Sequence, residues 1–127
     1  MTLEACPVWF GGEWHTVNSV PTTPVHNPSI GEVIAETPLC TTAHVNEAVE
    51  AAHAAFPAWM ETPPVERARF LFKFKHLLEE NFEDLVRCNT REHGKTLVES
   101  RGDVKRGIEM VEFACGVPSL LMGEVLE

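Results

Sequence analysis

Arg106 is the residue of this sequence whose placement most needs a chemical explanation. It lies within RGDVKRGIEMVEFACGVPSLL, residues 101–121, where the spacing of the apolar residues predicts a helix. The apolar residues fall on two sides of this helix: Val104, Ile108, Val111 and Cys115 on one, Met110 and Phe113 on the other. Arg106 projects between the last two. A helix that is apolar on two sides is typical of one packed between two layers.

Two interpretations of Arg106 follow from its chemistry. A guanidinium group stays charged, so it needs a carboxylate or several carbonyl oxygens wherever it is shielded from water. The first interpretation is a structural ion pair, with Glu109 or with an acidic residue elsewhere. The second is a ligand for a bound anion. The residue pattern alone favours the ion pair.

The string EHGKT, residues 92–96, contains the Gly-Lys-Thr that ends a phosphate-binding P-loop. Such a loop also needs a glycine five positions before Gly94, where this chain has Asn89, and it needs a preceding strand. The residues before Gly94 have helical periodicity. We therefore interpret Gly94 as the end of a helix.

The histidines and cysteines do not form a recognisable metal or catalytic motif. No two of the six histidines are spaced four apart, as a helical two-ligand site requires. The cysteines show no CxxC pair: Cys6, Cys40, Cys88 and Cys115. We expect reduced thiols and no metal site, with Cys115 as a small core residue rather than a nucleophile.

Composition excludes several classes of partner. The chain of 127 residues has a net charge of -9 and 44% hydrophobic residues, which is ordinary for a globular domain. Excess acidity argues against binding to nucleic acid or to an anionic membrane. No apolar run reaches about 18 residues and no signal peptide is visible, so we expect a soluble, cytoplasmic protein.

The elements that would position Arg106 can be predicted from residue patterns. PVWFGGEWHTV indicates a hairpin closed by Gly11 and Gly12, and GEVIAETP a strand after the turn NPSIG. Helical spacing predicts three helices: one from Thr41 or Thr42 that ends or kinks at Pro57, a long one over 66–94, and one over about 96–116. The expected fold class is α+β, a hairpin and strand followed by three helices.

Several segments together resemble the N-terminal part of aldehyde dehydrogenases. They occur in family order from Phe10 onward: FGGEW, VHNPSIGEVIAETP, AFPAW, PPVERARFLF, EHGKTLVESRGDVKRG and GIEMVEFA. The segment DVKRGIEMVEFACGVPSLLMGE is similar to the corresponding segment in the branch of CoA-acylating methylmalonate-semialdehyde dehydrogenases. The resemblance implies the α/β NAD-binding domain of such an enzyme.

The resemblance also implies a reaction. Members of this branch, which serves valine catabolism, oxidise a semialdehyde with NAD through a cysteine thioester. They then transfer the acyl group to CoA with loss of CO2, giving propionyl-CoA from methylmalonate semialdehyde or acetyl-CoA from malonate semialdehyde. The branch's substrate-binding arginine matches Arg106, so the resemblance reverses the preference for a structural ion pair.

Family members are several times longer than this chain. Their nucleophilic cysteine, oxyanion-binding asparagine and NAD-phosphate loop match nothing here, so we assign no catalytic and no cofactor-binding residue. We expect residues 1–127 to be an incomplete NAD-binding domain that is inactive alone and binds neither NAD nor CoA. Its expected partner is the remainder of the fold, in an enzyme that is a homo-oligomer. Two alternatives remain: an interaction module that docks on full-length homologues, or part of another aldehyde dehydrogenase branch.

Overall fold

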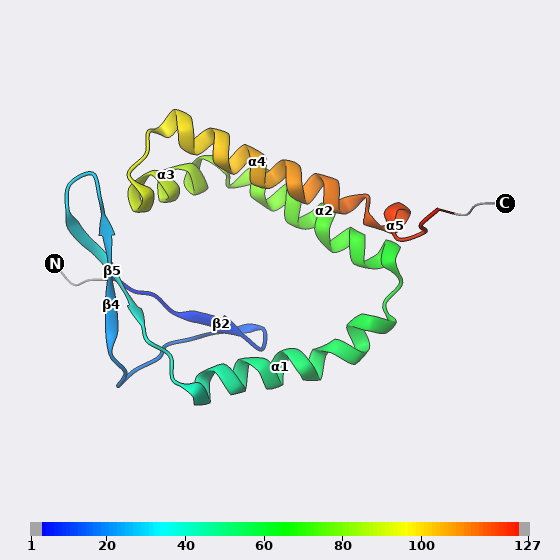
Figure 1. Cartoon of the computed structure of the whole chain (residues 1–127), viewed down its shortest axis with the longest axis horizontal. Coiled ribbons are helices and arrows are strands. Elements are labelled where there is room, and N and C mark those ends of the chain that lie inside the picture. Colours follow the sequence, from blue (N-terminus) through cyan, green and yellow to red (C-terminus); the bar gives the residue numbers. More distant parts are fainter. Residues whose placement is uncertain (1–3, 125–127) are drawn as a thin grey trace. The chain divides into compact units, whose positions relative to one another are not determined.

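The computed structural model describes residues 4–124, and the chain forms two compact units, Met1–Glu61 and Thr62–Glu127. The first contains five strands and one helix among its described residues, and the second contains four helices (Figure 1). The α+β class predicted from the sequence is confirmed. The predicted domain boundaries of 1–127 include residues 1–3 and 125–127, which lie outside the described part.

The hairpin predicted around Gly11 and Gly12 is present. Strand β2, Val8–Phe10, pairs antiparallel with β3, Glu13–His15. The two glycines have φ of 63° and 89°, which is the left-handed region that a two-residue hairpin turn requires. Across the pair, the ring centroids of Trp9 and Trp14 lie 5.0 Å apart in an edge-on arrangement.

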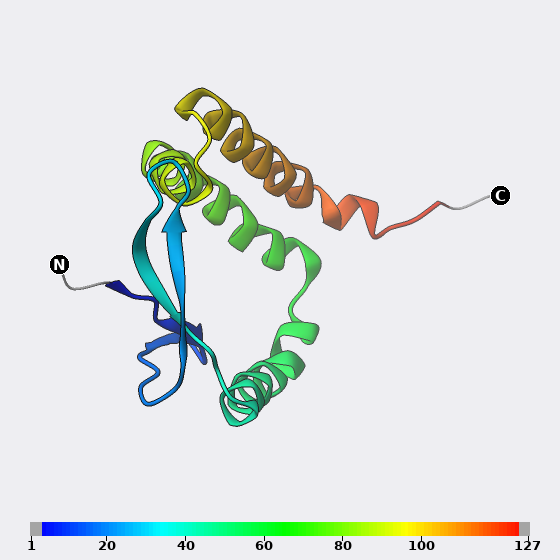
Figure 2. The same ribbon diagram turned by 60° about the vertical axis from the view of Figure 1, so that its left-hand side comes forward.

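A second sheet has the strand order β1-β5-β4, and one of its strands was not predicted. Strand β5, Glu32–Pro38, was expected; for the segment that contains β4, Thr22–Asn27, the proline-, threonine- and asparagine-rich sequence predicts only connection and edge structure, without a defined strand. The two strands pair antiparallel along their length, side by side in Figure 2. Since β4 is an edge strand, a proline there removes no ladder hydrogen bond from the sheet interior. The short β1, Glu4–Ala5, pairs parallel with the other side of β5.

Helix α1 runs over Thr42–Glu61 and contains Pro57. Thr41 comes immediately before it, and the Thr41 carbonyl oxygen accepts a hydrogen bond from the Val45 amide at 3.2 Å. This places Thr41 at the cap position, one of the two predicted. Pro57 does not end the helix, which continues for four more residues to Glu61.

The long helix predicted over residues 66–94 is two helices, so that single element was wrong. Helix α2 covers Pro64–Glu80 and α3 covers Phe82–His93, with Asn81 between them. The Asn81 side-chain amide donates to the Leu77 carbonyl oxygen at 2.8 Å, and its backbone amide donates to the same oxygen at 3.1 Å. Asn81 therefore satisfies the end of α2 and begins α3, a role that asparagine often has at helix boundaries.

Helix α4, Leu97–Cys115, is followed by the short α5, Val117–Leu120. The predicted helix over about 96–116 is thus confirmed, and α4 lies beside α2 and against α3 (Figures 1 and 2). The most buried side chains of this unit come from α2, α3 and α4: Ala68, Val86, Ser100, Ile108 and Cys115. Cys115 is a core residue, as expected. No helix within residues 4–124 is both long and apolar enough to cross a bilayer.

Candidate functional site

The connection between α3 and α4 is three residues long, and each residue has a structural role. Gly94 ends α3 with φ of 83°, and its amide donates to the Thr90 carbonyl oxygen at 2.9 Å. Thr96 begins α4 with a capping box: the Glu99 amide donates to Thr96 Oγ1 at 3.3 Å, and the Thr96 amide donates to Glu99 Oε2 at 2.9 Å. EHGKT is therefore a break between helices, as the sequence indicated, and not a phosphate-binding loop.

Side-chain contacts fix α4 against α3. Arg101 donates two hydrogen bonds to Glu83, from Nε to Oε1 and from Nη2 to Oε2, each 2.9 Å long. Deeper in the unit, Thr90 Oγ1 donates to Ser100 Oγ at 2.8 Å, and Ser100 is completely buried. A buried hydroxyl needs such a partner, since leaving it unpaired costs about 1–3 kcal/mol. These contacts set the rotation of α4 about its own axis.

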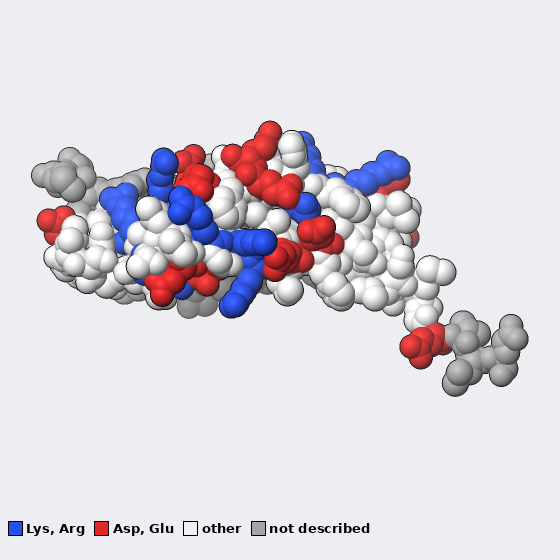
Figure 3. Space-filling view, turned by 90° about the horizontal axis from the view of Figure 1, so that it is seen from above, with Lys and Arg blue, Asp and Glu red and all other residues white. Residues whose placement is uncertain are grey.

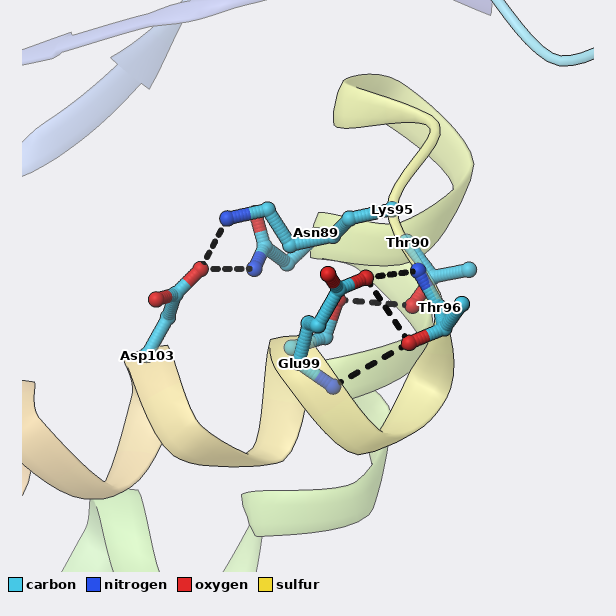
Figure 4. Close-up of polar contacts among 7 residues, drawn as sticks. Asn89, Thr90, Lys95, Thr96, Glu99 and Asp103 are labelled. Atoms are coloured by element: carbon cyan, nitrogen blue, oxygen red, sulfur yellow. Dashed lines mark hydrogen bonds and ion pairs between the residues drawn. The ribbon is translucent and has the colours of Figure 1, made fainter.

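Asp103, on α4, is held toward α3 by two partners on a single carboxylate oxygen. Lys95 Nζ donates a short hydrogen bond to Asp103 Oδ2, and Asn89 Nδ2 lies 3.5 Å from the same atom (Figure 4). The hydrogen bond from Lys95 is the main reason that the pKa of Asp103 lies below its ordinary value. Asn89 and the charge on Arg106 contribute less. Asp103 is therefore an ionised group with a partner of its own.

Arg106 lies one turn after Asp103 and is exposed. Within residues 4–124 its guanidinium makes no hydrogen bond and no ion pair. Glu109, the partner that a structural interpretation suggested, lies instead 3.9 Å from Lys105 Nζ. The ion pair favoured by the residue pattern is thus not formed within the described part of the chain. The role of Arg106 in substrate binding stays a prediction.

On α4, Arg106 has the acidic residues Asp103 and Glu109 three positions before and after it, and apolar side chains further along the same side. Met110 and Phe113, four and seven residues further along, are each 67% exposed, whereas Ile108 and Cys115 on the opposite side are buried. As predicted, α4 therefore has apolar residues on two sides. Figure 3, which shows the molecule from above the view of Figure 1, shows acidic and basic side chains interspersed next to a broad uncharged area. An anion bound at Arg106 would lie beside apolar side chains.

A groove of about 500 Å³ lies between α2, α3 and α4, with Phe74, Leu85 and Val104 among its lining residues. Arg106 is not part of its wall, so the arginine lies on an open helix face rather than in this groove. Sequence reasoning missed the contact between Lys95 and Asp103. The spacing of the two residues could have indicated this contact, because a lysine just before a helix can fold back onto an aspartate in the second turn of that helix.

The aldehyde dehydrogenase family model matches residues 14–127. Malonate-semialdehyde dehydrogenase 2 of Oceanobacillus iheyensis is 50% identical over 125 residues, which is 98% of this chain and 26% of that protein. The crystal structure of methylmalonate-semialdehyde dehydrogenase from Oceanimonas doudoroffii has a TM-score of 0.89 at 41% identity, covering 97% of this chain and 25% of that one. A putative methylmalonate-semialdehyde dehydrogenase from Sinorhizobium meliloti 1021, complexed with NAD, has a TM-score of 0.92 at 36% identity.

The chain spans about a quarter of the length of these relatives. Within that quarter the match is nearly continuous and includes both units of the fold. The two solved structures cover 97% and 99% of this chain. The chain belongs to the aldehyde dehydrogenase family.

Proposed function

We propose that these residues form the N-terminal part of the NAD-binding domain of a methylmalonate- or malonate-semialdehyde dehydrogenase. The proposal is supported by relatives of that activity at 50% and 46% identity and by two similar solved structures of the same kind. The reaction converts semialdehyde, CoA and NAD to acyl-CoA, CO2 and NADH. A cytoplasmic, homo-oligomeric enzyme is part of the same proposal.

The observation that carries this proposal is Arg106. Both semialdehydes bear a carboxylate at the end opposite the aldehyde, and a planar guanidinium can hold a carboxylate through two parallel hydrogen bonds. Arg106 is exposed and makes no hydrogen bond or ion pair within the described residues, so its donors are available. Met110 and Phe113 beside it would keep water from part of the ion pair, which strengthens the attraction.

The Gly-Lys-Thr of residues 94–96 does not offer a phosphate site for the cofactor. Gly94, Lys95 and Thr96 are occupied in ending α3, holding Asp103 and capping α4, so they do not fit a dinucleotide phosphate. We therefore assign no NAD or CoA ligand and no catalytic residue here. We propose that the 127-residue chain alone forms no NADH.

The test uses the native protein, captured from source cells with an antibody against residues 60–95. We expect a band several times larger than 14.1 kDa and CoA-dependent NADH formation with malonate semialdehyde. Propanal, which lacks the carboxylate, should be a much poorer substrate. Equal activity with both aldehydes would contradict the proposed substrate class and would favour another branch of the family.

A second candidate function is an interaction module that docks on full-length homologues. The observation in its favour is the set of exposed apolar side chains on α4 and after it: Met110, Phe113, Leu120, Leu121 and Met122. Exposed apolar area of this kind is typical of surfaces that bind another protein. A native band only at 14.1 kDa that co-elutes with a full-length relative would support it, and separate elution would exclude it.

A further inference from the structure

We propose that Lys95 is a positioning residue that keeps Arg106 available for a substrate carboxylate, an inference that rests on the proposed function. Asp103 precedes Arg106 by three residues, and side chains three apart on a helix are neighbours. An aspartate at that spacing is an intrahelical partner for an arginine. Such an ion pair would occupy the donors that a ligand needs.

The structure shows why this ion pair is not made. Lys95 and Asn89 both approach Asp103 Oδ2 from the α3 side, and Figure 4 shows the carboxylate directed toward them. Arg106 makes no ion pair with Asp103, although its charge is felt there as a small lowering of the Asp103 pKa. The two groups are therefore close enough to interact, yet Asp103 is bound elsewhere.

Lys95 also offsets the negative charge of Asp103. A lone carboxylate next to Arg106 would repel an incoming carboxylate, whereas Asp103 paired with Lys95 contributes little net charge. Both effects act in one direction, because each makes Arg106 a better ligand for an anion. Lys95 lies two residues before Leu97, the first residue of α4, and directly before Thr96 of the capping box.

The experiment compares Lys95→Gln, Asp103→Asn, the double variant and Lys73→Gln in the native protein. Lys73, on α2, is the control for the loss of one positive charge, because it is exposed and makes no ion pair within residues 4–124. Steady-state kinetics give KM and kcat with malonate semialdehyde. Calorimetric titration with malonate gives a dissociation constant that does not depend on turnover.

Lys95→Gln should raise KM and the malonate dissociation constant by about two- to five-fold, the size expected for one competing ion pair on an exposed helix. The value of kcat should change by less than about two-fold, because the reacting atoms are not touched. The double variant should recover the original KM, since the competing carboxylate is gone. Asp103→Asn alone should leave KM at or below its original value.

Two results would overturn the inference. One is a double variant as impaired as Lys95→Gln, which would mean that Lys95 acts through stability or by its own charge. The other is a raised KM for Asp103→Asn, which is informative even if Lys95→Gln does not fold. Arg106→Leu distinguishes failure of this inference from failure of the proposed function. If Arg106→Leu leaves KM unchanged, the proposed function itself fails. If only Arg106→Leu raises KM, the carboxylate site stands and Lys95 has no part in it.

Discussion

Arg101 and Glu83 join α4 to α3 through two parallel hydrogen bonds of 2.9 Å, the geometry in which a guanidinium and a carboxylate match best. Arg101 lies five residues before Arg106 on the same helix. The two arginines thus have different roles in the described part of the chain, one paired within the fold and one without a partner there. The paired arginine helps to set the direction of the other.

The contact between Arg101 and Glu83 should make the helical unit sensitive to acid. The hydrogen bond from Arg101 holds the pKa of Glu83 below its ordinary value of 4.5. The folded state therefore binds this proton less readily than the unfolded state, and the stability is lost as pH falls below about 4.5 through the folded pKa. We expect Glu83→Gln to reduce the slope of unfolding free energy against pH in that window, measured by urea unfolding.

Glu92→Gln is the control for this prediction, because Glu92 lies on the same helix and makes no ion pair within residues 4–124. The slope should not vanish in Glu83→Gln, since the pKa values of Glu99 and Asp103 are lowered as well. An unchanged slope would show that the bidentate contact does not persist in solution.

The capping box at the start of α4 can be tested with two substitutions at one position. Thr96→Ala removes the hydroxyl that accepts from the Glu99 amide, and it should lower the free energy of unfolding by about 1 kcal/mol. Thr96→Ser keeps the hydroxyl and should cost far less. Urea midpoints of the two variants give the comparison, and equal midpoints would speak against the cap.

Two glycines of the helical unit should respond in opposite directions to the same substitution. Gly94 has φ of 83°, so Gly94→Ala strains the backbone and should destabilise by about 1 kcal/mol. Gly102 lies inside α4, where an added methyl group meets no atom within 4 Å among the described residues. Gly102→Ala should therefore stabilise by about 0.5–1 kcal/mol, because alanine loses less entropy in a helix. Thermal unfolding of both variants checks the two signs.

The chemistry of Arg106 predicts that a lysine cannot replace it. Arg106→Lys keeps the charge but loses the planar fork, so KM for malonate semialdehyde should rise at least about ten-fold, with Arg106→Leu worse still. KM for propanal should change little in either variant. A lysine variant with the original KM would mean that only charge, and not two-point binding, is used.

The local structure around Arg106 was predictable because its signals are local. Gly94 stops one helix and Thr96, with Glu99 three residues on, starts the next, and both readings follow from residue type and spacing. The same holds for the hairpin at Gly11 and Gly12. In each case one backbone conformation is strongly preferred by the residues themselves.

The features that were missed depend on contacts or compete with stronger patterns. The apolar stripe of α2 continues through Leu85 and Cys88 of α3 at helical spacing, which hid the break at Asn81. Strand β4 is held by pairing with β5, and its proline and polar residues predict connection and edge structure without fixing where a strand begins or ends. The contact between Lys95 and Asp103 depends on how the chain passes from α3 to α4, which residue spacing alone does not give. For the same reason the sequence did not show that Arg106 lacks an ion pair in the described residues.

The three-residue connection between α3 and α4 has a consequence for how this segment can vary. Each of its three residues already makes a structural contact, so an inserted or deleted residue would disturb the cap of α3 or the cap of α4. It would also turn α4 by about 100° relative to α3, the rotation per residue of a helix, and would carry Arg106 to another side. Related proteins should therefore keep a connection of this length, even where the residues in it differ.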